Sequence, residues 1–199
     1  MKSVHFARFV AVTLIAGAFS TGNASAEPAP MPTTDFTAQW ELTGGPDQMM
    51  PSRITYSHAL NKMRIDMKMK DQEMTMIREM GSGRSLMWSS MMPSMAMRID
   101  TGKETKLEGD RTGRSDTVSG ESCEIWMAKE AEVCVTADGI PVRSVGNGFT
   151  ATMTKIDRSA QDAGTFEAPA GVQVMDMPQG MGGMGAMGAG MPGMPKLPF

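Results

Sequence analysis

Apolar and polar side chains alternate along several short segments of this chain, which is the pattern of half-buried β-strands. Phe36, Ala38, Trp40 and Leu42 alternate with polar residues. Segment 63–70 continues the pattern, with methionine or isoleucine at each odd position and a charged residue at each even one. Helical periodicity is scarce after the N-terminal segment. We therefore predict an all-β protein, mainly antiparallel, with few short helices.

The predicted strands are short and separated by turn residues. They cover 36–42, 54–56, 63–70, 74–80, 85–88, 95–100, 123–127, 133–136, 141–145 and 149–156. Turns are expected at Gly44-Gly45-Pro46, Asp138-Gly139 and Asn147-Gly148. The polar stretch 101–119 has no strand pattern, and its carboxylates at 104–116 are expected in a solvated loop. The strands together predict an antiparallel meander.

The first 26 residues have the features of a secretory signal peptide. Lys2 and Arg8 are followed by an apolar run over 9–19 and by an A-x-A cleavage site at 24–26. That run is too short to span a bilayer, and no later segment reaches about 18 consecutive apolar residues. We expect a periplasmic or secreted protein, cleaved near Ala26, that is not an integral membrane protein.

Composition divides the rest of the chain into three parts. Residues 27–34 are rich in proline and are expected to be a flexible leader. Residues 35–177 carry the strand pattern and fit one domain. Residues 178–199 consist mainly of glycine, methionine and proline, cannot bury a core, and are expected to be disordered.

Cys123 and Cys134 are the only cysteines. In an exported protein they predict a structural disulfide. A hairpin turn at Ala128-Lys129 would place the two cysteines directly opposite each other. The ten residues between them disfavour a reactive pair of the CxxC kind.

The charges of 63–80 predict the register of a second hairpin. A turn at Asp71-Gln72 would pair Lys70 with Glu73 on one face. On the other face, the same register would set Met69 opposite Met74 and Met67 opposite Met76.

Methionine is unusually frequent, at 24 of 199 residues. A thioether is a soft donor with no proton to lose, so several together favour Cu(I) or Ag(I) over Zn(II), Mg(II) or Ca(II). In the tail, glycines would let sulfurs three residues apart converge on one ion. The candidate ligands are Met67, Met69, Met74, Met76, Met91, Met92, Met95, Met97, Met175, Met177, Met181, Met184, Met187, Met191 and Met194. The leading hypothesis is a soft-metal-binding protein acting in sequestration or transfer.

Other uses of methionine stay open. Five are expected simply to fill the core: Met63, Met80, Met87, Met127 and Met153. Accessible methionines could instead line a groove for a lipid or acyl ligand, or serve as an oxidant sink that sulfoxide reductases restore.

Several function classes are disfavoured. His58 is the one histidine left after cleavage and is expected to be a solvated strand or turn residue, so an imidazole site for zinc or Cu(II) cannot be built. No spacing of acids, bases and nucleophiles resembles a catalytic triad, and we do not expect an enzyme. The formal net charge of −3 argues against nucleic acid as a partner.

Six segments together resemble an uncharacterised exported bacterial family, the domain of unknown function 4412. They are NKMRIDM, GRSLMW, PSMAMRID, VSGESCEIW, CVTADGIPVRS and QDAGTFEAPAGVQV, and the resemblance covers residues 36–175. Its strongest signatures are Gly120 with Cys123, the turn at 138–141 and the segment 166–171.

That family is similar to the LolA/LolB lipoprotein carriers and the sensor RseB. The resemblance therefore implies a curved antiparallel sheet, a half-barrel whose concave face can shelter an apolar ligand. This sequence departs from the pattern in its methionine content and in lacking clear helices to plug the concavity. The family supplies no activity, so function has to be argued from the site.

Overall fold

The computed structural model describes residues 27–44, 50–69, 71–100, 108–128, 131–146 and 148–177. The predicted signal peptide (1–26) and tail (178–199) lie outside these residues. Within the described ranges, no helix is long and apolar enough to cross a membrane.

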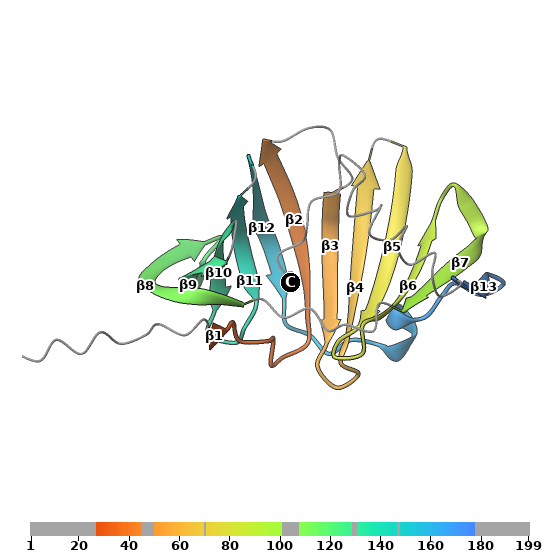
Figure 1. Cartoon of the computed structure of the whole chain (residues 1–199), viewed down its shortest axis with the longest axis horizontal. Coiled ribbons are helices and arrows are strands. Elements are labelled where there is room, and N and C mark those ends of the chain that lie inside the picture. Colours follow the sequence, from red (N-terminus) through yellow and green to blue (C-terminus); the bar gives the residue numbers. More distant parts are fainter. Residues whose placement is uncertain are drawn as a thin grey trace, which may run out of the picture.

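The described chain forms one sheet, as predicted for an all-β protein (Figure 1). Its strands are β1 (Glu27–Pro28), β2 (Phe36–Gly44), β3 (Met50–Ser57), β4 (Lys62–Met69), β5 (Gln72–Glu79), β6 (Arg84–Ser89), β7 (Met92–Asp100), β8 (Glu108–Val118), β9 (Glu121–Ala128), β10 (Ala131–Thr136), β11 (Pro141–Gly146), β12 (Phe149–Asp157) and β13 (Gln173–Asp176). One 3-10 turn, η1 (Ala163–Phe166), accompanies them.

The strands lie in the order β1-β8-β9-β10-β11-β12-β2-β3-β4-β5-β6-β7-β13. Two meanders, β2–β7 and β8–β12, are joined by antiparallel pairing of β2 with β12. Among the described pairs, only β7 with β13 is parallel.

The chain passes from β7 near one end of the sheet to β8 near the other, and this requires the sheet to bend. Ten strand-to-strand steps separate β8 from β7 in the sheet order, which is about 48 Å in a flat sheet. The connection from Asp100 to Glu108 can reach at most about 29 Å. The sheet therefore curls, as Figure 1 shows.

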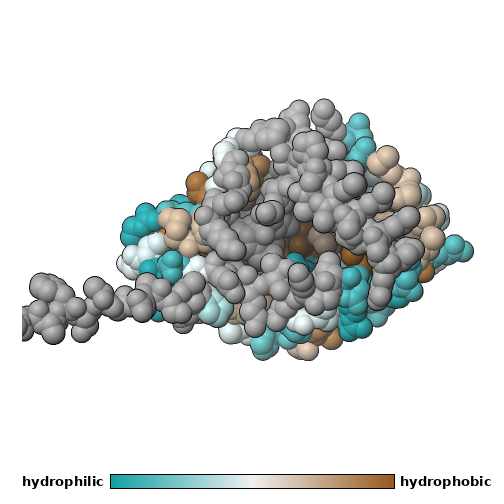
Figure 2. All heavy atoms as spheres, in the orientation of Figure 1, coloured by the Kyte–Doolittle hydropathy of each residue, from teal (hydrophilic) through white to brown (hydrophobic). Residues whose placement is uncertain are grey.

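One face of the curled sheet carries the main core, and we call it the apolar face. It is made by alternating residues of both meanders, among them Phe36, Ile54 and Ile65 from one and Ile125 and Cys134 from the other. Because both halves contribute to one buried cluster, the apolar face lies inside the bend. Pale-brown, moderately apolar residues also follow the side of the molecule formed by β5, β6 and β7 in Figure 2.

The segment 27–34, expected to be a flexible leader, instead lies against the sheet. β1 pairs with β8, and Ala29 is buried in a second cluster with Trp126. The backbone N–H of Thr33 donates to the carbonyl of Asp138 at 3.0 Å. Prolines hold such a segment extended before it docks, which lowers the entropy lost on ordering it.

Gly139, in the predicted Asp138-Gly139 turn, lies directly against this N-terminal segment. Its φ is 82°, and a Cβ at this position would lie 2.3 Å from the carbonyl oxygen of Met31. Any other residue would therefore push the segment away from the turn.

Two predicted registers differ from the structure. In the β4–β5 hairpin, Met67 lies opposite Met74 and Lys68 opposite Glu73. The predicted pairs Met69–Met74, Met67–Met76 and Lys70–Glu73 are therefore wrong. In the β9–β10 hairpin, Cys123 lies opposite Thr136 and Cys134 opposite Ile125. The predicted direct opposition of the cysteines is also wrong, and the two are diagonal neighbours.

A further correction concerns the polar stretch 101–119. Residues 108–118 of it form β8 instead of a solvated loop. Most side chains of this strand are exposed on both faces, so its sequence lacks the alternation by which the other strands are recognised. Its pairing with β9 holds it in the sheet.

Candidate functional site

A row of four methionines crosses the sheet at one level. Met76 on β5 is paired with Met87 on β6, and Met87 is paired with Met97 on β7. Met97 is in turn paired with Met175 on the parallel strand β13. Paired residues point to the same face of a sheet, so all four belong to the apolar face. We call these four residues the methionine row.

The spacing of the methionine row suits convergence on one ion. Directly opposed residues on antiparallel neighbours, here Met76–Met87 and Met87–Met97, have Cβ atoms about 4.5–5.5 Å apart. A methionine side chain has three rotatable bonds and an unbranched stem, so adjacent sulfurs can turn toward a shared point. Two or three neighbouring thioethers can therefore serve one soft ion without a change in the backbone.

A second methionine pair lies one level away on the same face. Met67 is directly opposite Met74, and Met74 lies two positions before Met76 on β5. Met67 is buried in the core, and Met74 and Met76 pack against it. The predicted strand-borne ligands Met67, Met74, Met76, Met97 and Met175 thus belong to one continuous patch.

Of the four residues in the row, Met175 at the sheet edge is the exposed one. Met87 and Met97 are partly buried, whereas the Met175 side chain is 51% exposed. The row is thus supported by the core at the β5 end and reaches solvent at β13.

The donor atoms that the methionine row supplies are thioether sulfurs, which suit soft metal ions. Within the described ranges, no three His, Cys, Asp or Glu side chains are placed to hold a metal. His58 is exposed in the turn after β3. Thioethers do not titrate, so the donors of the row keep their form at any pH.

The other predicted ligands take different positions. Met91 and Met92 are exposed around the β6–β7 turn, Met95 is paired with Gln173 beside the row, and the backbone N–H of Met177 donates to the carbonyl of Arg98. The side chain of Met69 is outside the description, and so are the tail ligands Met181, Met184, Met187, Met191 and Met194.

Met87, at the centre of the row, was expected only to fill the core. Its position between Met76 and Met97 follows only when the registers of both the β5–β6 and the β6–β7 hairpins are known. Met63, Met80 and Met153 are buried as expected, but Met127 is 44% exposed on β9.

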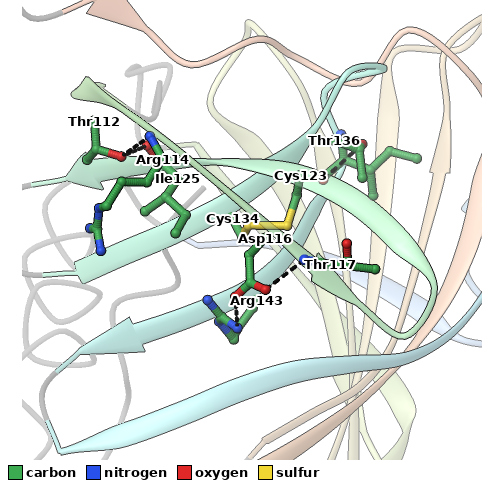
Figure 3. Close-up of a disulfide and its surroundings, with 10 residues drawn as sticks. Thr112, Arg114, Asp116, Thr117, Cys123, Ile125, Cys134, Thr136 and Arg143 are labelled. Carbon is green, nitrogen blue, oxygen red and sulfur yellow. Dashed lines mark hydrogen bonds and ion pairs between the residues drawn. A yellow bond between two sulfur atoms is a disulfide. The ribbon is translucent and has the colours of Figure 1, made fainter.

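The disulfide lies in the other meander, where both cysteines belong to the same core cluster as the apolar face; Figure 3 shows the bridge and its surroundings. Cys123 and Cys134 are bonded with a Cα–Cα distance of 5.4 Å, which confirms the predicted bridge. Beside it, Asp116 accepts a hydrogen bond from the Thr117 N–H at 2.7 Å and pairs with Arg143 at 2.7 Å. The Thr117 hydrogen bond and then Arg143 hold the pKa of Asp116 below its usual value. A buried bridge of this kind is typical of proteins from oxidising compartments outside the cytoplasm.

No protein-family model and no curated protein matches the chain. The resemblance to the domain of unknown function 4412 therefore rests on the quoted motifs alone.

Several solved structures are similar to the structure of this chain. An uncharacterised conserved protein from Thermus thermophilus is 10% identical with a TM-score of 0.55, over 73% of this chain and 91% of that one. PNGF-II is 9% identical with a TM-score of 0.54, over 73% of this chain but 32% of its own length, so the chain spans about a third of that protein. MucB matches with a TM-score of 0.33 at 11% identity, over 72% of this chain and 60% of that one. At such identities the first two likenesses concern the fold alone.

Proposed function

We propose that this protein binds a soft monovalent metal ion, Cu(I) or Ag(I), through the methionine row, and acts outside the cytoplasm in sequestering or handing on that ion. The observation that carries the proposal is the register of four strands, which aligns Met76, Met87, Met97 and Met175. Thioether donors select these ions over harder divalent ones.

Core packing alone accounts poorly for the outer part of the row. Burial of apolar surface contributes about 25 cal/mol per Å² removed from water, so a half-exposed side chain gains only part of it. Met175 lies on a four-residue edge strand where every residue is exposed. A β-branched residue would suit such a strand better on packing grounds. An accessible sulfur at this position is therefore better explained by chemistry than by packing.

A lipid or acyl ligand is the second candidate, and one observation favours it. The methionine row continues at the same level into Ile65 on β4 and Ile54 on β3. Sulfur and aliphatic carbon thus form one uninterrupted apolar strip, which adaptable methionines could mould around an acyl chain.

Titration with Ag(I) and Cu(I) against a competing chelator tests the proposal. Replacing the row with leucine, as M76L/M87L/M97L/M175L, removes the sulfurs while nearly conserving volume. We expect the variant to bind at least tenfold more weakly and to hold fewer ions per chain. Met127→Leu, which removes an exposed strand methionine outside the row, is the matched control and should bind as the wild type does.

A second variant distinguishes metal binding by the tail from metal binding by the methionine row. It carries leucine at Met181, Met184, Met187, Met191 and Met194. If this variant loses all binding while the row variant loses none, the row is not the site. No retention by the wild type at micromolar free metal, together with acyl chains that co-purify in native mass spectra, would favour the second candidate instead.

A further inference from the structure

β13 is attached to the sheet differently from every other described strand. It is four residues long, and each of its residues is exposed. It pairs in parallel with Met95–Arg98 of β7 alone. A parallel pair is slightly less stable per residue than an antiparallel one. The apolar burial that holds the central strands is thus nearly absent here.

The polar contacts that hold β13 gather at one residue of β7. Arg98 Nη1 pairs with Asp176 Oδ1 at 2.7 Å, with side chains 51% and 75% exposed. The carbonyl of Arg98 accepts a hydrogen bond from the Met177 N–H at 3.0 Å. Ion pairs this exposed contribute little to stability, so these contacts orient β13 without fastening it firmly.

The 3-10 turn η1, which precedes β13 in the chain, is held firmly. Phe166 at the end of η1 is buried, the Thr165 carbonyl accepts a hydrogen bond from Arg64 Nη1 at 3.1 Å, and Asp162 caps η1 through the Gly164 N–H. β13 can therefore leave β7 while the preceding segment and the rest of the sheet stay in place.

We infer that a bound soft metal ion fastens β13 to β7, and that β13 detaches when the ion leaves. This inference rests on the proposed function. Met87, Met97 and Met175 follow one another on three neighbouring strands, and Met175 reaches the ion only when β13 is attached. An ion that binds the attached form with three sulfurs and the detached form with two shifts the equilibrium toward attachment. At saturating ion, the shift equals the ratio of the ion's affinities for the attached and the detached form, so a tenfold preference shifts the equilibrium about tenfold.

Hydrogen exchange of the full-length protein, measured by mass spectrometry with and without Ag(I), tests the inference. Peptides covering 173–177 should exchange at least tenfold more slowly with Ag(I), whereas β9 and β10 should not change. Met175→Leu keeps the strand but removes its sulfur. It should still bind Ag(I) through Met87 and Met97, yet gain no protection over 173–177. Met127→Leu should behave as the wild type does.

The outcomes separate the inference from the proposed function. Ag(I) binding that leaves exchange over 173–177 unchanged overturns the inference and leaves the proposed function standing. Equal protection in Met175→Leu also overturns it, because the ion would then act without that sulfur. Absence of Ag(I) binding in the parallel titration overturns both.

Discussion

Methionine residues of this protein occupy environments that range from full burial to exposure at a strand edge. The Met153 side chain is 0% exposed and fills the core between the two meanders, whereas Met91 is 68% exposed at a turn. Between these limits lies the methionine row, where sulfur is supported by the core and still accessible. The environment of each side chain therefore decides which methionine sulfurs are accessible to an oxidant or a ligand.

Limited oxidation should distinguish the exposed methionines from the buried ones. With substoichiometric peroxide, Met91 and Met175 should become sulfoxides before Met153 and Met63, because an oxidant must reach the sulfur. Saturating Ag(I) should slow the oxidation of Met175 but leave the oxidation rate of Met91 unchanged. Peptide mapping by mass spectrometry measures both effects. Early oxidation of Met153, or equal rates at all four residues, would contradict the placement of these side chains.

The sequence alone selects the faces of strands better than it selects individual partners. In β4, the odd positions Met63, Ile65 and Met67 are buried as their alternation predicts. Met87 was not grouped with Met76 and Met97 because their alignment depends on two hairpin registers at once.

At the scale of elements, both predicted hairpins are displaced by two residues. A shift by two keeps every side chain on its face, so the hydrophobic pattern cannot detect the error. Charge pairing cannot detect it either, since Lys68 replaces Lys70 as the partner of Glu73, at 3.6 Å. Moving a turn by one residue along the chain shifts the register of its hairpin by two residues. Neither turn has the Asn-Gly or Asp-Gly signal that would have identified its position.

The β9–β10 bridge gives a prediction at this scale. Removing it as C123A/C134A should lower the free energy of unfolding by about 3 kcal/mol, because the unfolded chain regains the entropy of an open loop. Urea unfolding of both proteins measures the difference. Ag(I) affinity should change by less than about twofold, since the disulfide and the methionine row lie in different meanders. A large loss of affinity would show that the two parts of the sheet are coupled.

At the scale of the whole molecule, two polar clusters join segments that are distant in sequence. Arg158, just after β12, pairs with Glu121 of β9 at 2.7 Å and with Asp138 of the β10–β11 turn at 2.8 Å. Asp35 accepts hydrogen bonds from the backbone N–H groups of His58 at 2.7 Å and Gln161 at 2.9 Å. These contacts anchor the segments before β2 and after β12 to the sheet.

The carboxyl groups of these clusters have lowered pKa values. The Arg158 hydrogen bond holds the pKa of Glu121 below its usual value. Burial would raise the pKa of Asp138, but hydrogen bonds from Arg158 and Thr136 outweigh it and the pKa is lowered. For Asp35, the Gln161 N–H is the main cause of a lowered pKa. Groups with lowered pKa values stabilise the fold at neutral pH, and that contribution is lost as the pH falls below about 4.

Arg158→Met should therefore destabilise the protein more at neutral than at acid pH. We expect a loss of about 1–2 kcal/mol at pH 7, given the partial exposure of all three side chains. The loss should shrink as the pH falls below about 4, because the stabilising contribution of carboxyl groups with lowered pKa values is lost in acid. Urea unfolding across this range measures it, with Arg158→Lys as the variant that keeps the charge. An equal loss at pH 3 and pH 7 would show that Arg158 acts through packing alone.

The fold class could be read from the sequence, but the two ends of the sheet could not. β8 and β13 bury few side chains, so neither leaves a periodic pattern; backbone pairing with an already formed neighbour places them. The prolines of 27–34 suggested flexibility, yet Ala29 packs beside Trp126, a contact between segments that no local pattern encodes.

The division of the sheet into two meanders has a consequence for how the protein folds. Within each meander, neighbouring strands are consecutive in the chain, and contacts so local in sequence form rapidly. The pairing of β2 with β12, which sets Gly44 beside Phe149, closes a much longer loop and is expected to form late. The methionine row belongs to β5–β7 and the edge strand β13, and the disulfide to β9–β10. A nascent molecule still in its reduced form can therefore already have Met76, Met87 and Met97 aligned, so disulfide formation and the proposed metal binding need not occur in a fixed order.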